Sequence, residues 1–312
     1  MLDLRCTVID ALEAPGGQCI ALYPEKPIYD IPGYPEISAG ELIEKLLAQA
    51  RPFQPAFHLG QPVTSLAKTG DGFRLITAKG VMVEARAVII AGGVGAFGPN
   101  RPPLEDLAQF EASGCVQYLV KRRDDFANKR IVIAGGGDSA VDWALSLSAI
   151  AQSLAIVHRR DKFRAAPESE RRLRALAAAG KVELVIPYQL DGLEGAGGKL
   201  DAVIVKDFSN QTRRIPADVL LPFYGLAQDL GPIAGFGLNL DRHLISVDPA
   251  TCATSAQGVF AVGDIVTYPG KLMLILAGFA EAALAAHAAR AYLRPGEAFH
   301  FEYSTTRGVP KP

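Results

Sequence analysis

The stretch from residue 131 to residue 150 constrains this chain most, because a strand, a glycine-rich turn and a helix follow one another directly. Ile131–Ala134 is a short run of mostly branched apolar residues, typical of a parallel strand buried on both faces. Gly135–Ala140 follows with the sequence G-G-G-D-S-A, and Val141–Ile150 has helical character. This order of elements is the fingerprint of a dinucleotide-binding βαβ unit.

Each position of the turn has a physical role in holding a pyrophosphate. Gly135 permits the tight turn, Gly137 lets the phosphates approach the backbone, and Ala140 keeps the helix close to the strand. Asp138 and Ser139 lie in the turn just before the predicted helix, whose free N–H groups and positive dipole end attract anions. We therefore predict that these five residues bind the dinucleotide.

The residues after the next predicted strand indicate which dinucleotide is bound. Leu154–Val157 reads as that strand, and about twenty residues past the glycines an NAD site would present an acid to the ribose. Here the chain has His158, Arg159 and Arg160 instead, with Arg164 close behind. A guanidinium fork suits a 2′-phosphate, so we predict NADP(H). The alternative is a glycine turn beside an ordinary solvated basic run.

Composition indicates an ordinary globular protein. A length of 312 residues suggests about two domains, and 49% hydrophobic residues suffice for large cores. The formal net charge of −1 gives no general attraction to nucleic acid or to an anionic membrane. The four cysteines are scattered, without C-x-x-C spacing, so we expect no zinc site or other metal centre and a reducing, cytoplasmic location.

The longest apolar stretch, Leu272–Leu293, approaches the length of a membrane span. Glu281, His287 and Arg290 interrupt it, and alanine dominates its second half. We therefore expect a buried helix of an α/β domain and no membrane association. No basic and apolar leader opens the chain, which gives no sign of secretion.

The remaining signals predict two nucleotide-binding halves, the second inserted into the first. In chain order the other predicted elements are strand 5–10, a helix within 36–51 capped by Ser38, antiparallel strands 61–66, 73–77 and 81–84, strand 87–91, helix 169–179, strand 182–187, a meander over 190–214, and strands 219–224 and 259–262. Residues 98–103 read as a linker. The predicted fold is α/β, with two three-layer, Rossmann-like domains: 103–225 for NADP(H), and a discontinuous domain of 1–98 and 235–312.

A second constellation lies near the end of the chain. Val259–Val262 is a predicted strand followed by Gly263 and Asp264, with a helix beyond Tyr268. An acid at the carboxyl end of a strand can accept hydrogen bonds from the hydroxyls of a sugar alcohol. The following helix start can stabilise negative charge on a reduced flavin ring.

Several motifs together resemble flavoprotein reductases of the thioredoxin-reductase superfamily. In the order found there, the chain carries Asp10, P-G-G-Q at 15–18, the glycine turn at 135–140, H-R-R at 158–160 with F-R at 163–164, and V-F-A-V-G-D at 259–264. L-Y-P-E-K at 22–26, Y-D-I-P-G at 29–33 and Y-P-G-K at 268–271 are more narrowly similar to the thioredoxin-reductase-type ferredoxin–NADP⁺ reductases. The likeness covers nearly the whole chain.

The resemblance implies an FAD site as well as an NADP(H) site. The residues that it assigns to FAD are Asp10 at the adenosine ribose, Gln18 and Tyr23 along the flavin, Val63 at the adenine, Phe97 near the ring system, Asp264 at the ribityl chain, and Thr305 at the flavin from the partner subunit. It also implies a homodimer that exchanges electrons with ferredoxin or flavodoxin. The two cofactors carry the chemistry, so no catalytic side chain is predicted.

Two departures from the family pattern leave alternatives open. Thioredoxin reductases carry a redox C-x-x-C before the second glycine motif, where this chain has only Cys115, so thiol–disulfide exchange lacks its resolving thiol. The family also begins one strand and one G-x-G-x-x-G turn before the strand that ends at Asp10, so we expect a start upstream of Met1. The alternatives are an NADP(H)-binding remnant with a defective FAD site, and a related NADPH oxidoreductase with another acceptor.

Overall fold

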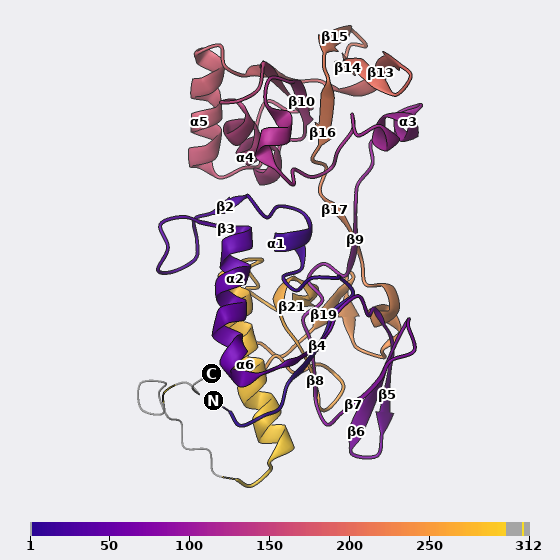
Figure 1. The fold of residues 1–312 in the computed structure, drawn as a ribbon, viewed down its shortest axis with the longest axis vertical. Coiled ribbons are helices and arrows are strands. Elements are labelled where there is room, and N and C mark those ends of the chain that lie inside the picture. Colours follow the sequence, from indigo (N-terminus) through magenta and orange to yellow (C-terminus); the bar gives the residue numbers. More distant parts are fainter. Residues whose placement is uncertain (1, 298–307, 309–312) are drawn as a thin grey trace. The chain divides into compact units, whose positions relative to one another are not determined.

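The computed structural model describes residues 2–297 and 308, and for residues 96–97 and 226–228 it describes the backbone alone. The chain forms two compact units: unit 1 comprises Met1–Phe97 and Gln228–Pro312, and unit 2 comprises Gly98–Ala227. Unit 2 is thus an insertion between the two segments of unit 1. The chain passes between them along β9 (Ala96–Pro99) and β17 (Leu226–Asp229) (Figure 1).

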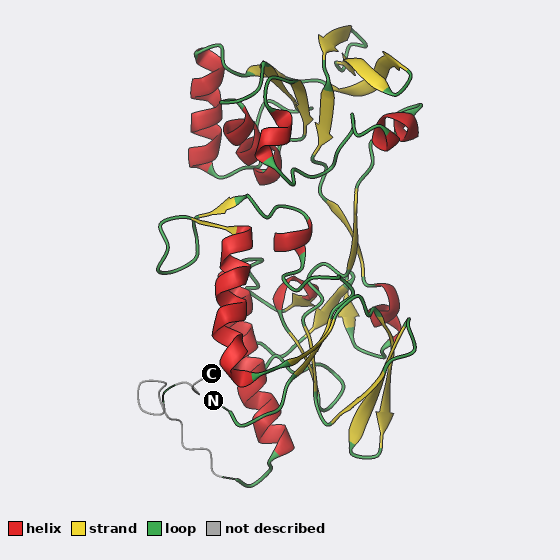
Figure 2. Cartoon of the chain, viewed as in Figure 1, coloured by secondary structure: helices red, strands yellow, loops and turns green. Residues whose placement is uncertain are grey.

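Unit 2 is built around a parallel sheet and an antiparallel meander. Its elements are α3 (Leu107–Ala112), η2 (Arg123–Phe126), β10 (Arg130–Ala134), α4 (Asp138–Leu147), β11 (Ser153–Val157), α5 (Pro167–Ala178), β12 (Glu183–Val185), β13 (Gln189–Ala196), β14 (Lys199–Lys206), β15 (Thr212–Pro216) and β16 (Val219–Pro222). The parallel sheet has the order β12-β11-β10-β16, and β13-β14-β15 form the meander. Helices α4 and α5 pack together, and α4 lies on β10 and β11 (Figure 2).

The order of the parallel strands reverses at β10. From β10 the chain proceeds to β11 and β12 on one side, whereas β16 lies on the other. A crevice forms outside the carboxyl ends of the strands where the strand order reverses in this way. Residues 131–134 of β10 are at most 1% exposed, as expected for a parallel strand covered on both faces. The glycine turn follows at this edge.

Unit 1 contains shorter strands and two longer helices. Its elements are β1 (Thr7–Ile9), α1 (Gln18–Ala21), β2 (Pro27–Ile28), β3 (Ile37–Ser38), α2 (Ala39–Ala50), η1 (Arg51–Phe53), β4 (Ala56–His58), β5 (Val63–Thr69), β6 (Gly72–Thr77), β7 (Met82–Ala85), β8 (Val88–Ile90), η3 (Gly231–Gly235), β18 (Leu240–Asp241), β19 (Leu244–Ser246), β20 (Val259–Ala261), η4 (Gly263–Ile265), β21 (Val266–Thr267) and α6 (Ile275–Leu293). β1 pairs in parallel with β4, β8 pairs in parallel with β20, and β5-β6-β7 form the predicted meander.

Helix α2 begins where the sequence predicts. The hydroxyl of Ser38 accepts a hydrogen bond from the Glu41 N–H at 3.2 Å, which satisfies one free donor of the first turn. Leu42 of α2 is buried with Ile31 and Ile37, and Ile275 at the start of α6 packs against this cluster. Helices α2 and α6 therefore lie side by side in unit 1 (Figure 1).

Helix α6, which the sequence predicts as a buried helix, is buried along one face and exposed along the other. Ala285 and Ala289 pack with Phe260 and Val262 of the β20 segment, because a helix lying on a sheet buries one stripe. Leu276, Phe279 and Leu284 are 39–45% exposed. Among residues 2–297, no helix combines the length and the unbroken apolar character that crossing a membrane requires.

Candidate cofactor-binding sites

The glycine turn of unit 2 leaves space at only one of its three glycines. Gly135 has φ +149°, and a Cβ there would lie 2.5 Å from the carbonyl oxygen of Phe223. A Cβ on Gly136 would overlap the imidazole of His158. A Cβ on Gly137 would meet no atom within 4 Å. Gly135 and Gly136 are thus required by the fold, whereas Gly137 faces open space that a ligand can enter.

The first turn of α4 presents backbone donors beside that space. Gly137 is the N-cap residue, and no side chain caps the helix. The carboxylate of Asp138 instead accepts a hydrogen bond from the Ala166 N–H at 2.9 Å, and Ser139 is exposed. Ala140 is fully buried against the turn. The helix start is therefore free to receive an anion, and Asp138 holds the loop that carries Arg164.

Three arginines form a positive cluster at the same place. Arg159, Arg160 and Arg164 are exposed, and none of them forms an ion pair with a carboxylate in the described part of the chain. The Arg164 N–H donates to the Gly136 carbonyl at 2.6 Å, which fixes the loop against the glycine turn. Burial and the charges of these arginines lower the pKa of His158. An unneutralised cationic cluster of this kind attracts a phosphate.

Two residues to which the sequence analysis assigned no role, Phe163 and Arg174, support the arginine loop. Phe163 is 2% exposed and stacks on His158, with ring centroids 5.4 Å apart. The guanidinium of Arg174, on α5, lies 5.7 Å from the centre of the Phe163 ring and donates to the Asp161 carbonyl at 2.8 Å. Arg174 also pairs with Glu170 at 2.8 Å. Only the apolar Phe163 inside a basic run could have signalled this arrangement.

Replacing Arg174 with glutamine is expected to weaken binding of 2′,5′-ADP roughly two- to fivefold, because a partly exposed contact of this kind is worth about 0.5–1 kcal/mol. Binding of 5′-AMP, which lacks the 2′-phosphate, should not change. Isothermal titration of both nucleotides measures the two affinities. Arg171→Gln is the matched control, since Arg171 pairs with Glu168 on the same helix and, among the described residues, makes no ion pair with the loop. Equal affinities in both variants would exclude a supporting role for Arg174.

In unit 1, predicted flavin residues from separate segments come together. Strands β8 and β20 are parallel neighbours, so the turns that follow them, Gly92–Gly95 and Gly263–Asp264, lie at one sheet edge. Gly93 has φ +59°, and a Cβ there would lie 3.5 Å from the amide nitrogen of Gln18. Asp264 is half-buried and is close enough for its charge to act on Tyr23.

Cys19 belongs to the same cluster although the sequence did not mark it. Burial raises the pKa of the Cys19 thiol, a hydrogen bond with Tyr23 opposes that shift, and the charge of Asp264 adds to it. Burial also raises the pKa of Tyr23, which therefore stays a neutral hydrogen-bonding phenol. Gln18, Tyr23 and Asp264 thus provide an amide, an aromatic ring and a carboxylate in one place. This set fits a flavin, which needs a stacking surface and acceptors for its sugar-alcohol hydroxyls.

The positions of the other residues predicted to bind FAD say less about a flavin site. Asp10 follows β1 and accepts a hydrogen bond from the Leu12 N–H at 2.9 Å, as an acid at the end of a strand does in a turn. Val63 begins β5 and packs against the core of unit 1. Phe97 lies in β9, where only the backbone is described, and Thr305 lies outside the described residues.

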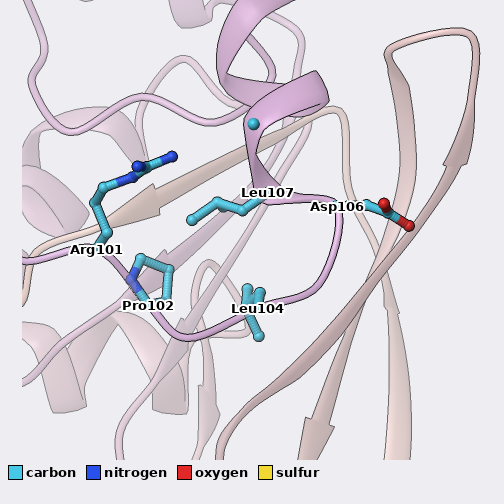
Figure 3. A pocket seen from close by; sticks show the side chains of 6 residues that line it. Arg101, Pro102, Leu104, Asp106 and Leu107 are labelled. Atoms are coloured by element: carbon cyan, nitrogen blue, oxygen red, sulfur yellow. The ribbon is translucent and has the colours of Figure 1, made fainter.

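Two surface hollows lie apart from these residues. One, of about 370 Å³, is lined by Arg101, Pro102, Leu104 and the start of α3 (Figure 3). Its Arg101 pairs with Glu111. The other, of about 530 Å³, is formed by residues 29–35 alone. Neither is lined by a residue predicted to bind a cofactor, and the cofactor assignments rest on the turns and charges described above.

Comparison with known proteins shows the family of this chain. Residues 4–288 match the family model described as pyridine nucleotide-disulphide oxidoreductase. A ferredoxin–NADP reductase of Paramagnetospirillum magneticum is 62% identical over 100% of this chain and 92% of its own length. One from Rhodospirillum rubrum is 60% identical, covering 99% and 91%.

Solved structures with low sequence identity have the same fold. The thioredoxin reductase of T. acidophilum has a TM-score of 0.81 at 22% identity, covering 93% of this chain and 91% of that one. The enzyme from Lactococcus lactis has a TM-score of 0.80 at 24% identity, with the same coverage. The predicted α/β class with two Rossmann-like units is confirmed. The chain therefore belongs to the pyridine nucleotide-disulphide oxidoreductase family and, within it, to the ferredoxin–NADP reductases of the thioredoxin-reductase-like type.

Proposed function

We propose that this chain is a flavoprotein oxidoreductase that transfers electrons between NADPH and ferredoxin, or flavodoxin, through FAD. The observation that carries the NADPH assignment is the cluster of Arg159, Arg160 and Arg164, which have no carboxylate partner in the described part of the chain. The Arg164 N–H holds this cluster against the glycine turn. The cluster supplies a charge that a 2′-phosphate needs and that NADH does not use. The assignment to ferredoxin rests on relatives that carry that name.

The proposed NADP(H) domain is 103–225. Gly135 and Ala140 form the turn, the open space at Gly137 admits the pyrophosphate, and the N–H groups at Asp138 and Ser139 receive it. His158, with its pKa lowered, is a neutral ring beneath the arginines and adds no further charge at neutral pH. The protein therefore binds and orients NADPH with backbone donors and guanidinium groups.

The proposed FAD domain comprises 1–98 and 235–312. FAD, when bound, exchanges a hydride with the nicotinamide and single electrons with an iron–sulfur or flavin partner. Asp264 would hold its ribityl hydroxyls, Gln18 and Tyr23 would line its ring, and Asp10 would take the adenosine ribose. Val63, Phe97 and Thr305 complete the assignment that the family resemblance implies.

The cysteines support an electron acceptor other than a disulfide. All four cysteines are free thiols in the structure. Cys115, which stands where thioredoxin reductases carry their redox pair, donates through its sulfur to the Gly198 carbonyl at 3.3 Å. A single thiol cannot form and resolve the mixed disulfide that disulfide reduction requires. We also propose a cytoplasmic location, which the scattered free cysteines support. A homodimer is proposed as well, and the family resemblance supports it.

Parallel assays of NADPH oxidation test this function. With FAD supplied, we expect NADPH-dependent reduction of ferredoxin or flavodoxin and no reduction of a thioredoxin-type disulfide. NADH in place of NADPH is the internal control and should support a much lower rate. Disulfide reduction without ferredoxin reduction would favour the alternative oxidoreductase. A protein that binds 2′,5′-ADP but retains no flavin absorption would favour the NADP(H)-binding remnant.

A further inference from the structure

The carboxylate of Glu281 in unit 1 is buried, and the proposed function assigns it no role. Glu281 of α6 is 3% exposed, and within the described residues Thr77 is the only other polar residue that is buried as a whole. Burying a carboxylate is costly unless opposite charge and hydrogen bonds compensate for the lost water. Glu281 therefore stands out in a helix whose other buried residues are Ala285 and Ala289.

Three donors satisfy Glu281. One oxygen, Oε2, accepts from the Gly263 N–H at 2.6 Å, and the other, Oε1, accepts from the Tyr268 hydroxyl at 2.7 Å and from Lys271 Nζ at 2.5 Å. The Lys271 side chain is itself only 6% exposed and lies 5.7 Å from the centre of the Tyr268 ring. Burial alone would raise the pKa of Glu281, but these bonds outweigh burial and lower it.

The network joins three segments that are separate in sequence. Gly263 begins the turn after β20, Tyr268 and Lys271 close a turn of their own with a backbone bond of 3.1 Å, and Glu281 lies on the second turn of α6. Gly278, one turn before Glu281, lies beside Gly263: a Cβ on Gly278 would stand 3.8 Å from the Gly263 Cα, at ordinary van der Waals distance. Each segment is thus fixed by the same carboxylate.

Gly263 needs this support because of its backbone. It has φ +81°, in the left-handed region, and has no side chain of its own to pack, whereas its neighbours Val262 and Ile265 are buried. The Glu281 hydrogen bond is the side-chain contact that orients its peptide group. This N–H belongs to the Val262–Gly263 peptide, and Asp264 follows one residue later. Fixing that peptide therefore limits the rotations about Gly263 that would redirect the Asp264 carboxylate.

We propose that Glu281 is a positioning residue for the flavin site: paired with Lys271, it fixes the Gly263 peptide and thereby aims Asp264 at the ribityl chain of FAD. This inference rests on the proposed function, because it assumes that Asp264 binds FAD. The group that matters is the acceptor for the Gly263 N–H. The charge of Glu281 serves to balance Lys271 in a site that excludes water.

Two double variants separate positioning from simple stability. Glu281→Gln/Lys271→Met removes both charges but keeps an amide oxygen for Gly263 and an amide N–H₂ that can donate to Tyr268. Glu281→Leu/Lys271→Met also removes both charges but leaves Gly263 without an acceptor. Replacing a buried ion pair with matched neutral or apolar groups is often tolerated, so both variants should fold. Glu281→Gln alone leaves Lys271 unpaired and serves as the destabilised comparison.

The measurement is the FAD dissociation constant of each folded apoprotein, from quenching of FAD fluorescence, together with the thermal unfolding midpoint of the same apoprotein. We expect Glu281→Gln/Lys271→Met to bind FAD as tightly as the unmodified chain does. Glu281→Leu/Lys271→Met should bind FAD roughly tenfold or more weakly. A loss of this size is typical of losing one hydrogen bond that involves a charged group. Equal FAD affinity in the two double variants would overturn the inference. Failure of the unmodified chain to bind FAD would overturn the proposed function instead, and the inference with it.

Discussion

Replacing Arg159 with alanine is expected to weaken NADPH binding roughly 10- to 150-fold while leaving NADH binding unchanged, because a hydrogen bond between charged groups is worth about 1.5–3 kcal/mol. Arg159 has no carboxylate partner within the described residues, so its charge is available to a ligand. Burial raises the pKa of Tyr224, which follows β16, to about 12, and the positive charge of Arg159 opposes this shift. Arg159 is thus close to the end of β16, beside the crevice where the sheet order reverses.

Equilibrium titrations with NADPH, NADH and 2′,5′-ADP measure the effect of Arg159→Ala directly. Arg171→Ala is the matched control, because Arg171 is an exposed arginine of the same unit that pairs with Glu168. It should leave all three affinities unchanged. If Arg159→Ala weakened NADPH and NADH equally, the residue would not distinguish the two coenzymes and the NADP(H) assignment would lose its main support.

The dinucleotide unit was predictable because its signals are local. An apolar run, a glycine turn and a helical pattern occur within twenty residues, and each is enforced by contacts close in sequence. Ala140, for example, lies 3.2 Å from where a Cβ on Gly135 would stand. The start of α4 was expected at Val141 but is at Asp138, since polar residues at a helix start resemble a turn in sequence.

Elements that depend on tertiary pairing were not predictable. Strands β2, β3, β18 and β21 have two residues each, too few for an alternating pattern, and exist only because a partner strand is near. The support networks of the sites were missed for the same reason. Arg174 contacts a carbonyl 13 positions away, and Glu281 binds an N–H 18 positions away. Glu281 was visible as a charge in an apolar helix, but its partners were not.

Replacing Gly137 with valine is expected to abolish tight NADPH binding without unfolding the protein. A Cβ at Gly137 meets no protein atom within 4 Å, and its backbone, with φ −93° and ψ −179°, is extended and suits a β-branched residue. The side chain would instead occupy the space from which the pyrophosphate reaches the first N–H groups of α4. Losing two charge-assisted bonds there corresponds to roughly 3–6 kcal/mol, a loss of more than about 100-fold in affinity.

The matched comparison is Gly135→Ala, two residues earlier, which should lower the stability of the fold. Its Cβ would lie 2.5 Å from a backbone oxygen that cannot move independently, at φ +149°, so the variant should lose about 1–3 kcal/mol of folding free energy. Chemical denaturation and NADPH titration of both variants separate the two effects. Gly137→Val should keep its unfolding midpoint while losing NADPH binding. Unchanged NADPH affinity in a folded Gly137→Val protein would place the pyrophosphate elsewhere, because no ligand can share that space with a valine side chain.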